Sequence, residues 1–239
     1  LSMTNFKREL TITDLVFVIG PRINAAGRIE HGQQAVELLL SHDLSQAEQI
    51  GLRIDRNNTH RQDLDKEITR QALGMFEKEG PLRDSWSTVI FNSTWHKGVV
   101  GIVASRLIET HYRPTVVLTE SNGKASGSAR SVKGFDVHEA ISACAHLLDQ
   151  FGGHMYAAGL SMPVENVDAF RERFEEVVRA RMPENLRVPE EEIDLEIGLD
   201  RVSDRLVRDV QHMAPFGPCN MRPVFLSRGV VDSGSARIV

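Results

Sequence analysis

Residues 88–119 read TVIFNSTWHKGVVGIVASRLIETHYRPTVVLT, and the architecture is worked out from this stretch. Its two ends, residues 88–91 and 115–119, are β-branched and apolar, as buried strands are. Residues 99–110 between them repeat apolar side chains at helical spacing. A strand, a helix and a second strand make a βαβ unit, so the sequence predicts an α/β domain.

The segments that follow extend this domain to about residue 182. Small and polar residues alternate over 124–131, which fits a third strand, and a short strand is expected at 160–162. A helix is predicted over 136–150 with Asp136 as its N-cap, and an amphipathic helix over 166–181. A Pro- and Glu-rich linker then leads to further strands at 193–199 and 224–231 and a short helix near 203–213.

The part that precedes the βαβ unit contains one long helix. Residues 1–42 are too few to bury a core of their own. Residues 43–79 carry apolar side chains at helical spacing, with charges between them. Asn57 and Asn58 interrupt the apolar stripe, so we expect the middle of this helix to be exposed. Asp63 and Asp65, two positions apart, are expected to be solvated surface charges.

The composition is that of a soluble globular protein. The 239 residues are 41% apolar and 26% charged. The sequence contains no run of 18 apolar residues, which is about the length that a membrane-spanning helix needs. Two cysteines cannot make a disulfide framework, so a cytoplasmic protein is expected. The net charge is −5, yet residues 122–135 contain three bases and no acid. Such a local positive strip can still attract phosphate.

Residues 150–159 read QFGGHMYAAG, in which Gly152 and Gly153 precede His154. Glycines let an anion approach the backbone N–H groups without a Cβ in the way, and the imidazole adds a donor. A glycine would equally well end the helix expected over 136–150. A ligand loop and a helix C-cap therefore both remain possible interpretations of this segment.

Three other segments combine small residues with donors for an anion. In residues 21–28, Asn24 and Arg28 stand among alanine and glycine. In residues 127–131, Ser128 and Arg130 also have small neighbours. Residues 95–101 lie where a strand passes into a helix, whose first amides favour an anion. The alternatives are a surface loop, an edge strand and an ordinary connecting loop. We find no P-loop, His-Glu-x-x-His or Gly-x-Ser-x-Gly motif, and hence no convincing activator of a nucleophile.

Taken in order with residues 215–225, these segments resemble the RecJ single-strand-specific exonucleases of the DHH phosphoesterase superfamily. The resemblance implies an α/β fold with a mixed-sheet, DHH-associated substrate-binding domain at 84–182. A long connector helix at 43–80 would precede it, after the end of a DHH catalytic domain at 1–42. Residues 190–239 would open an OB-like β-domain, here truncated.

The same resemblance implies a function. It implies a 5′-to-3′ exonuclease of DNA repair and recombination that uses Mn²⁺ or Mg²⁺, with Asn24 and Arg28 at the catalytic cleft. Ser128, Arg130 and His154 would hold the phosphates of single-stranded DNA. The metal ligands would lie upstream, so this chain alone is expected to be inactive and to bind no metal. The alternatives are a phosphodiesterase of short oligonucleotides or cyclic dinucleotides, and a non-catalytic nucleic-acid-binding module.

Overall fold

The computed structural model describes residues 8–78, 84–231 and 234 of the chain. It divides into two compact units. The larger unit includes Val16–Pro189, and the smaller one includes Glu9–Leu15 and Glu190–Val239.

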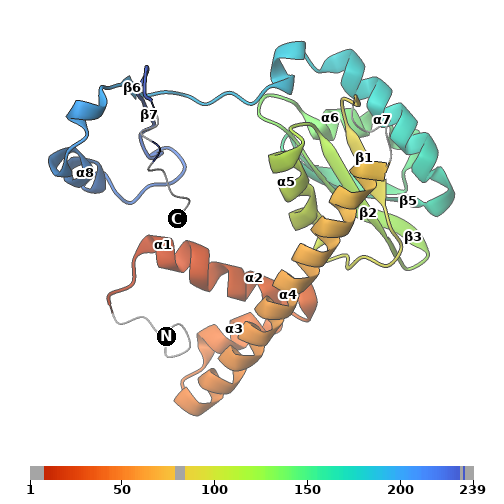
Figure 1. Ribbon diagram of the computed structural model, residues 1–239. Helices are drawn as coiled ribbons and strands as arrows, with labels where there is room; N and C mark the ends of the chain where they lie inside the picture. The colour runs from red at the N-terminus through yellow and green to blue at the C-terminus, as the bar shows by residue number, and fades with distance from the viewer. Residues whose placement is uncertain (1–7, 79–83, 232–233, 235–239) are drawn as a thin grey trace. The chain divides into compact units, whose positions relative to one another are not determined.

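A five-stranded sheet forms the centre of the larger unit (Figure 1). Its spatial order is β1-β2-β3-β5-β4, and the bounds are β1 Thr88–Phe91, β2 Thr115–Ser121, β3 Lys124–Arg130, β4 Gln150–His154 and β5 Ala157–Pro163. Strands β1 and β2 are parallel and are joined by α5, Val100–Thr110, whereas the other three pairs are antiparallel. The predicted βαβ unit and the mixed sheet are both confirmed.

Helices cover the two faces of the sheet unequally. Helices α6 (Val137–Ser142) and α7 (Val167–Arg181) share a core with Val116 and Leu118 of β2. The alternate residue, Val117, packs on the other face against α5 and the end of α4. Because successive side chains of a strand point to opposite faces, these two cores lie on opposite sides of the sheet.

The long helix α4, Leu44–Lys78, has 35 residues and joins two packing groups, as predicted (Figure 1). Ile68, Ala72 and Phe76 belong to the core beneath α5. Ile54, near the other end, packs with residues of α2 (Gly20–Ile29) and α3 (Gln33–Leu40). Residues 21–28, for which a surface loop was one of two interpretations, are part of α2, which follows the short helix α1 (Ile12–Asp14) and the π-helical turn η2 (Leu15–Ile19).

The middle of α4 is exposed on one side only: Thr59, His60 and Asp63 are exposed, as predicted, but the prediction was wrong for Asn57, Asn58 and Asp65. Asn57 and Asn58 are buried, and Asn58 accepts a hydrogen bond from Arg61 at 3.1 Å. Asp65 is 1% exposed, and both of its carboxylate oxygens accept hydrogen bonds from Arg106 of α5 at 2.9 and 3.0 Å. A single-helix pattern cannot reveal such burial, because Asn58 and Asp65 find their partners in Arg61 of the same helix and Arg106 of α5.

The helix predicted over 136–150 is also wrong beyond its first two turns. Asp136 is the N-cap, as predicted, and accepts from the backbone N–H of Glu139 at 2.9 Å. However, α6 ends at Ser142, a 3-10 turn (η4) covers Ala145–Leu147, and β4 begins at Gln150. Every residue of β4 is exposed, so this edge strand lacks the alternating pattern by which strands are recognised.

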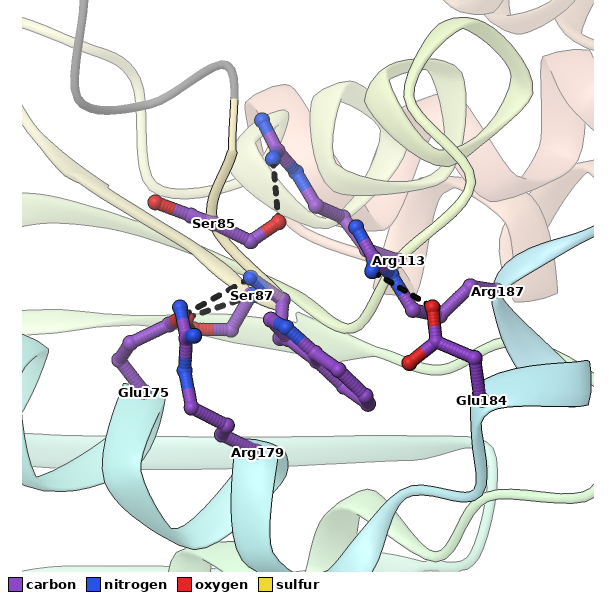
Figure 2. A network of polar contacts seen from close by, with 8 residues as sticks. Ser85, Ser87, Arg113, Glu175, Arg179, Glu184 and Arg187 are labelled. Atoms are coloured by element: carbon purple, nitrogen blue, oxygen red, sulfur yellow. Dashed lines mark hydrogen bonds and ion pairs between the residues drawn. The ribbon is translucent and has the colours of Figure 1, made fainter.

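A polar network fixes the start of β1 to α7 and to η6, Glu184–Arg187 (Figure 2). The indole of Trp86 lies between two guanidinium groups, with Arg187 at 4.5 Å and Arg179 at 5.8 Å from its ring centre. Glu175 accepts from the backbone N–H groups of Trp86 and Ser87 at 2.9 and 2.8 Å. These contacts connect the start of β1 to two elements that lie about 80 to 100 residues further along the chain.

The described part of the smaller unit contains a two-stranded parallel sheet, the short helix α1 and the helix α8. Strand β6 (Leu195–Glu196) pairs with β7 (Phe225–Leu226), and α8 (Asp204–Gln211) is capped by Ser203. The 3-10 turns η5 (Val164–Asn166) and η7 (Leu199–Arg201) complete the two units. The predicted strands are present but shorter than expected. Within the described ranges, no helix is both long and apolar enough to cross a membrane.

Candidate nucleic-acid interface

The face of the sheet that carries α5 is left open over β5 and β4. Strand pairing places residues of β3, β5 and β4 side by side in three rows. The first row is Arg130, Ala157 and His154; the second is Ser128, Gly159 and Gly152; the third is Ser126, Ser161 and Gln150. The second row also aligns with Val117, which contacts α5, so all three rows lie on the α5 face.

Where α5 does not cover this face, its small residues leave the backbone of the sheet open to solvent. Gly152, Gly159 and His154 are all exposed. Four of the predicted site residues, Ser128, Arg130, Gly152 and His154, are therefore brought onto one surface. Gly153 points to the opposite face and is the exception among the sheet residues.

Arg130 is held in place by its neighbours at the end of β3. Its Nη1 donates to Oγ of Ser128 at 2.6 Å and to the backbone oxygen of Ala129 at 2.8 Å. Ser128 in turn donates to the backbone oxygen of Ala158 at 3.4 Å. In this structure Ser128 therefore orients the guanidinium, which favours planar, bidentate contact with an anion.

The electrostatic surroundings of Arg130 are positive. Burial lowers the pKa of Arg130, and the charge of Arg28 lowers it further. No ion pair to Arg130 occurs between residues that the structure describes. A partly desolvated cation beside a second cation is a favourable partner for a phosphate.

The first turn of α5 approaches the same guanidinium. A Cβ at Gly101 would lie 3.0 Å from Nη2 of Arg130 and 3.2 Å from Oγ of Ser128. Val99, the N-cap of α5, makes no side-chain hydrogen bond to the helix. The amide end of α5 and the guanidinium of Arg130 thus lie together, and both attract negative charge.

Asn24 and Arg28 lie one turn apart on α2 and are both exposed, so they share one side of that helix. Nη1 of Arg28 donates to the backbone oxygen of Gly98 at 3.2 Å, in the loop that precedes α5. A Cβ at Gly98 would lie 2.1 Å from the backbone oxygen of Arg28, so only glycine allows this approach. Arg28 is therefore close to the β3 site, whereas no contact of Asn24 with that site is observed.

The glycine pair of β4 divides into two roles. A Cβ at Gly153 would lie 2.2 Å from the backbone oxygen of Ala157, and its φ of +153° is rare for other residues. Gly152 has no atom within 4 Å of the position of a Cβ. Gly153 is required by strand packing, and Gly152 leaves open space above the sheet. The expected ligand loop is thus a β-hairpin, and neither glycine is the C-cap of a helix.

His154 is exposed at the edge of the sheet, and its Nδ1 accepts from the backbone N–H of Tyr156 at 3.3 Å. This bond fixes Nδ1 as an acceptor, which leaves Nε2 to donate outwards in the neutral ring. In the first row, Ala157 is the only residue between His154 and Arg130.

The acid-free strip of residues 122–135 does not form one surface, contrary to what the sequence suggested. Lys124, at the other end of β3, pairs with Asp149 at 3.0 Å. Lys133 is exposed in the loop before α6. Asp149 comes from outside the strip, so counting charges along the chain could not reveal this pair. Arg130 is the base of the strip that lies in the first row.

Four further polar residues of this face, Lys97, Ser126, Gln150 and Ser161, were not among the predicted site residues, although Lys97 and Gln150 lie in segments singled out from the sequence. They line a trough of about 400 Å³ that includes Gly152 and Gly159. Ser126 precedes Ser128 by two residues on the same strand. Because alternate side chains of a strand point to the same face, the sequence could have predicted that both serines face the same way. Lys97 belongs to a loop held by Trp95, whose Nε1 donates to Gln71 at 2.7 Å and whose backbone oxygen accepts from Thr119 at 2.6 Å.

Within the described ranges, no group of three or more His, Cys, Asp or Glu residues is placed to hold a metal ion. The described residues gather groups that attract anions on one open face. It offers one guanidinium, one imidazole, an amide-rich helix end and a floor of glycines.

Comparison with known families defines the class of the two units. Residues 86–180 match the DHHA1 domain, and residues 193–239 match the RecJ OB domain. The fold class predicted from the sequence, including the OB-like part, is thereby confirmed. This chain belongs to the RecJ family and corresponds to the portion that carries these two domains.

Relatives from several bacteria support this assignment. The chain is 38% identical to the single-stranded-DNA-specific exonuclease RecJ of Bacillus subtilis, over 90% of this chain and 27% of the relative. It is 30% identical to RecJ of Escherichia coli, over 91% of this chain and 39% of the relative. RecJ of Thermus thermophilus in complex with Mn²⁺ superposes with a TM-score of 0.78 at 31% identity, covering 90% of this chain and 31% of that structure. The chain thus spans less than half the length of these relatives.

Proposed function

We propose that this chain is the substrate-binding portion of a single-stranded-DNA-specific, 5′-to-3′ exonuclease that acts in the cytoplasm in DNA repair and recombination. The open face of the DHHA1 sheet receives the sugar–phosphate chain. Arg130 and His154 bind one phosphate, Ser128 orients Arg130, and Gly152 lets the strand lie close to the sheet. Asn24 and Arg28 on α2 contact the same strand from the catalytic side.

The observation that carries this proposal is the environment of Arg130. Its guanidinium is partly buried, lies next to Arg28, and forms no ion pair among the described residues. A charge in such a place is poorly solvated and uncompensated, so a bound phosphate stabilises it. The first row and the first turn of α5 supply further donors at the same place.

The proposal assigns the chemistry to a part of the enzyme outside this chain. Solved RecJ structures contain Mn²⁺ or Mg²⁺, and we propose that such an ion activates the attacking water. The chain described here positions the substrate and neutralises its charge. Alone, it is expected to release no nucleotides from single-stranded DNA in the presence of Mn²⁺.

A binding experiment tests the function directly. The purified chain is titrated into fluorescently labelled DNA of equal length, 5′-phosphorylated and either single- or double-stranded, and anisotropy is recorded. We expect binding of the single strand that is clearly tighter than that of the duplex and weakens as salt is added. Equal affinity for both, or no binding, would contradict the proposal. Release of labelled nucleotides with Mn²⁺ would contradict the assignment of catalysis to another part.

The same titration separates the alternative substrates. A phosphodiesterase of cyclic dinucleotides would bind a cyclic dinucleotide more tightly than a twelve-nucleotide strand. The proposal predicts the reverse, since the open face continues beyond the first row and can contact more than one nucleotide.

A further inference from the structure

The trough next to the first row is a separate hollow of the DHHA1 surface. It has a volume of about 400 Å³ and lies over the second and third rows of the open face. Its polar side chains are Lys97, Ser126, Ser161 and Gln150. Neither Arg130 nor His154 belongs to its lining, so the first row and the trough are adjacent but distinct places.

The spacing of the rows suits a chain of nucleotides. Adjacent rows are two residues apart along each strand, which is about 6.7 Å at the usual rise of a β-strand. A sugar–phosphate chain that has one phosphate at Arg130 and follows the direction of β3 therefore passes over the second row. The glycines of this row, Gly152 and Gly159, carry no side chain that would lift it from the sheet.

The chemistry of the trough differs from that of the first row. Lys97 provides one exposed ammonium group, whereas Ser126, Ser161 and Gln150 provide neutral donors and acceptors. Asp149 is the acid next to this row in sequence, and its carboxylate is paired with Lys124 at 3.0 Å. Neutral hydrogen-bonding groups with a single cation suit a sugar and one phosphodiester better than a terminal phosphate.

We propose that this trough is the subsite for the second nucleotide of the bound single strand, with Lys97 contacting the phosphodiester that follows the terminal phosphate. The hydroxyls of Ser126 and Ser161 and the amide of Gln150 bind the deoxyribose and its phosphodiester oxygens. This inference rests on the proposed function and adds the path of the strand. It makes Lys97 and Gln150 determinants of substrate length rather than of binding to the first phosphate.

The double variant Lys97→Ala/Gln150→Ala tests this subsite. Both side chains are exposed, so the domain is expected to keep its melting temperature. The two probes are thymidine 5′-monophosphate and the 5′-phosphorylated trinucleotide of thymidine, each measured by calorimetric titration of the full chain. Wild type is expected to bind the trinucleotide at least tenfold more tightly than the mononucleotide. The double variant should lose about five- to tenfold for the trinucleotide and less than twofold for the mononucleotide.

Two further variants make the outcome specific. Arg130→Ala should weaken both probes, because it removes the contact to the terminal phosphate. Lys133→Ala removes an equal charge from an exposed site in another loop and should change neither. An unchanged trinucleotide affinity in the double variant, or an equal loss for both probes, would overturn the subsite. If wild type bound neither probe, the proposed function would fail together with the subsite.

Discussion

Two arginines of the DHHA1 domain differ in their surroundings: Arg113 is buried and Arg130 is partly buried. Arg113 is 8% exposed; its Nε donates to Oγ1 of Thr88 at 2.8 Å and its Nη1 to the backbone oxygen of Ser85 at 2.7 Å. Its guanidinium also lies over the ring of Phe76, 5.5 Å from the ring centre. Arg130 is anchored at one nitrogen, Nη1, and borders the open face.

The charges around the two arginines explain the difference in role. Burial lowers the pKa of both groups. For Arg113 the charge of Glu175 opposes this effect and the charge of Arg187 adds to it, whereas the charged neighbour that acts on Arg130 is a cation, Arg28, with no carboxylate of the described residues beside it. Arg113 donates to groups inside the protein, among them Ser85 (Figure 2), whereas the guanidinium of Arg130 borders the open face. We propose that a phosphate from outside the chain compensates Arg130, and that this separates it from the structural Arg113.

Removing the compensated arginine should have the largest effect on stability. Arg113→Ala deletes two hydrogen bonds from a charged donor and removes the donor to the buried hydroxyl of Thr88. We expect the free energy of unfolding to fall by about 2–4 kcal/mol in chemical denaturation. Arg130→Ala, at the partly exposed site, should change it by less than about 1 kcal/mol. Equal losses in the two variants would remove the distinction between the sites.

The glycine pair offers a second matched test, with Gly153 on the packed face and Gly152 on the open face. Gly153→Ala places a methyl group against the backbone of β5, so stability should fall by about 1–3 kcal/mol. Gly152→Ala should keep the melting temperature but weaken binding of a twelve-nucleotide strand severalfold, because its methyl group projects into the trough. If Gly152→Ala bound as wild type does, close approach of the strand to β4 would be refuted.

A smaller effect is expected where α5 touches Arg130. Gly101→Ala puts a methyl group 3.0 Å from Nη2 of Arg130, and the guanidinium must shift by a few tenths of an ångström. Alanine favours a helix over glycine by up to about 1 kcal/mol, so stability should be unchanged or slightly higher. Affinity for single-stranded DNA should fall about threefold. Unchanged affinity, measured by anisotropy, would show that the position of Nη2 does not matter.

The smallest expected effect is on the pH dependence of stability, and it involves His111, on which the charge of Arg113 acts. His111 stacks on Phe76 at 4.4 Å, and burial, followed by the charge of Arg113, lowers its pKa. As pH falls through about 6.5, the unfolded chain takes up this proton before the folded one, so stability decreases. His111→Phe should reduce this loss between pH 7 and pH 5. The contrary result is an identical pH profile for the variant and wild type.

The βαβ core was predictable because its signals are local. Residues 88–119 alternate strand, helix and strand, and apolar spacing alone predicts this order. Strand β4 was not predictable, since every one of its residues is exposed and pairing with β5 alone makes it a strand. Asn57, Asn58 and Asp65 were misjudged because their burial depends on what packs against α4, as Arg106 of α5 does on Asp65, and one helical pattern does not contain this.

The candidate site was predictable in composition but not in layout. Ser128, Arg130, Gly152 and His154 were expected from small residues next to donors, and the structure places them on one face. The different roles of Gly152 and Gly153 depend on which face each residue takes. That choice follows from strand register, which the sequence does not reveal while the strand itself is unrecognised.

The salt dependence of single-strand binding tests the central claim, that Arg130 is a cation compensated by a DNA phosphate. The chain, its Arg130→Ala variant and the Lys133→Ala control are titrated against one labelled single strand over a range of salt concentrations. Loss of one phosphate contact should reduce the slope of log K against log salt by about 0.7 for Arg130→Ala, with Lys133→Ala matching wild type. Parallel lines for Arg130→Ala and wild type would contradict the account.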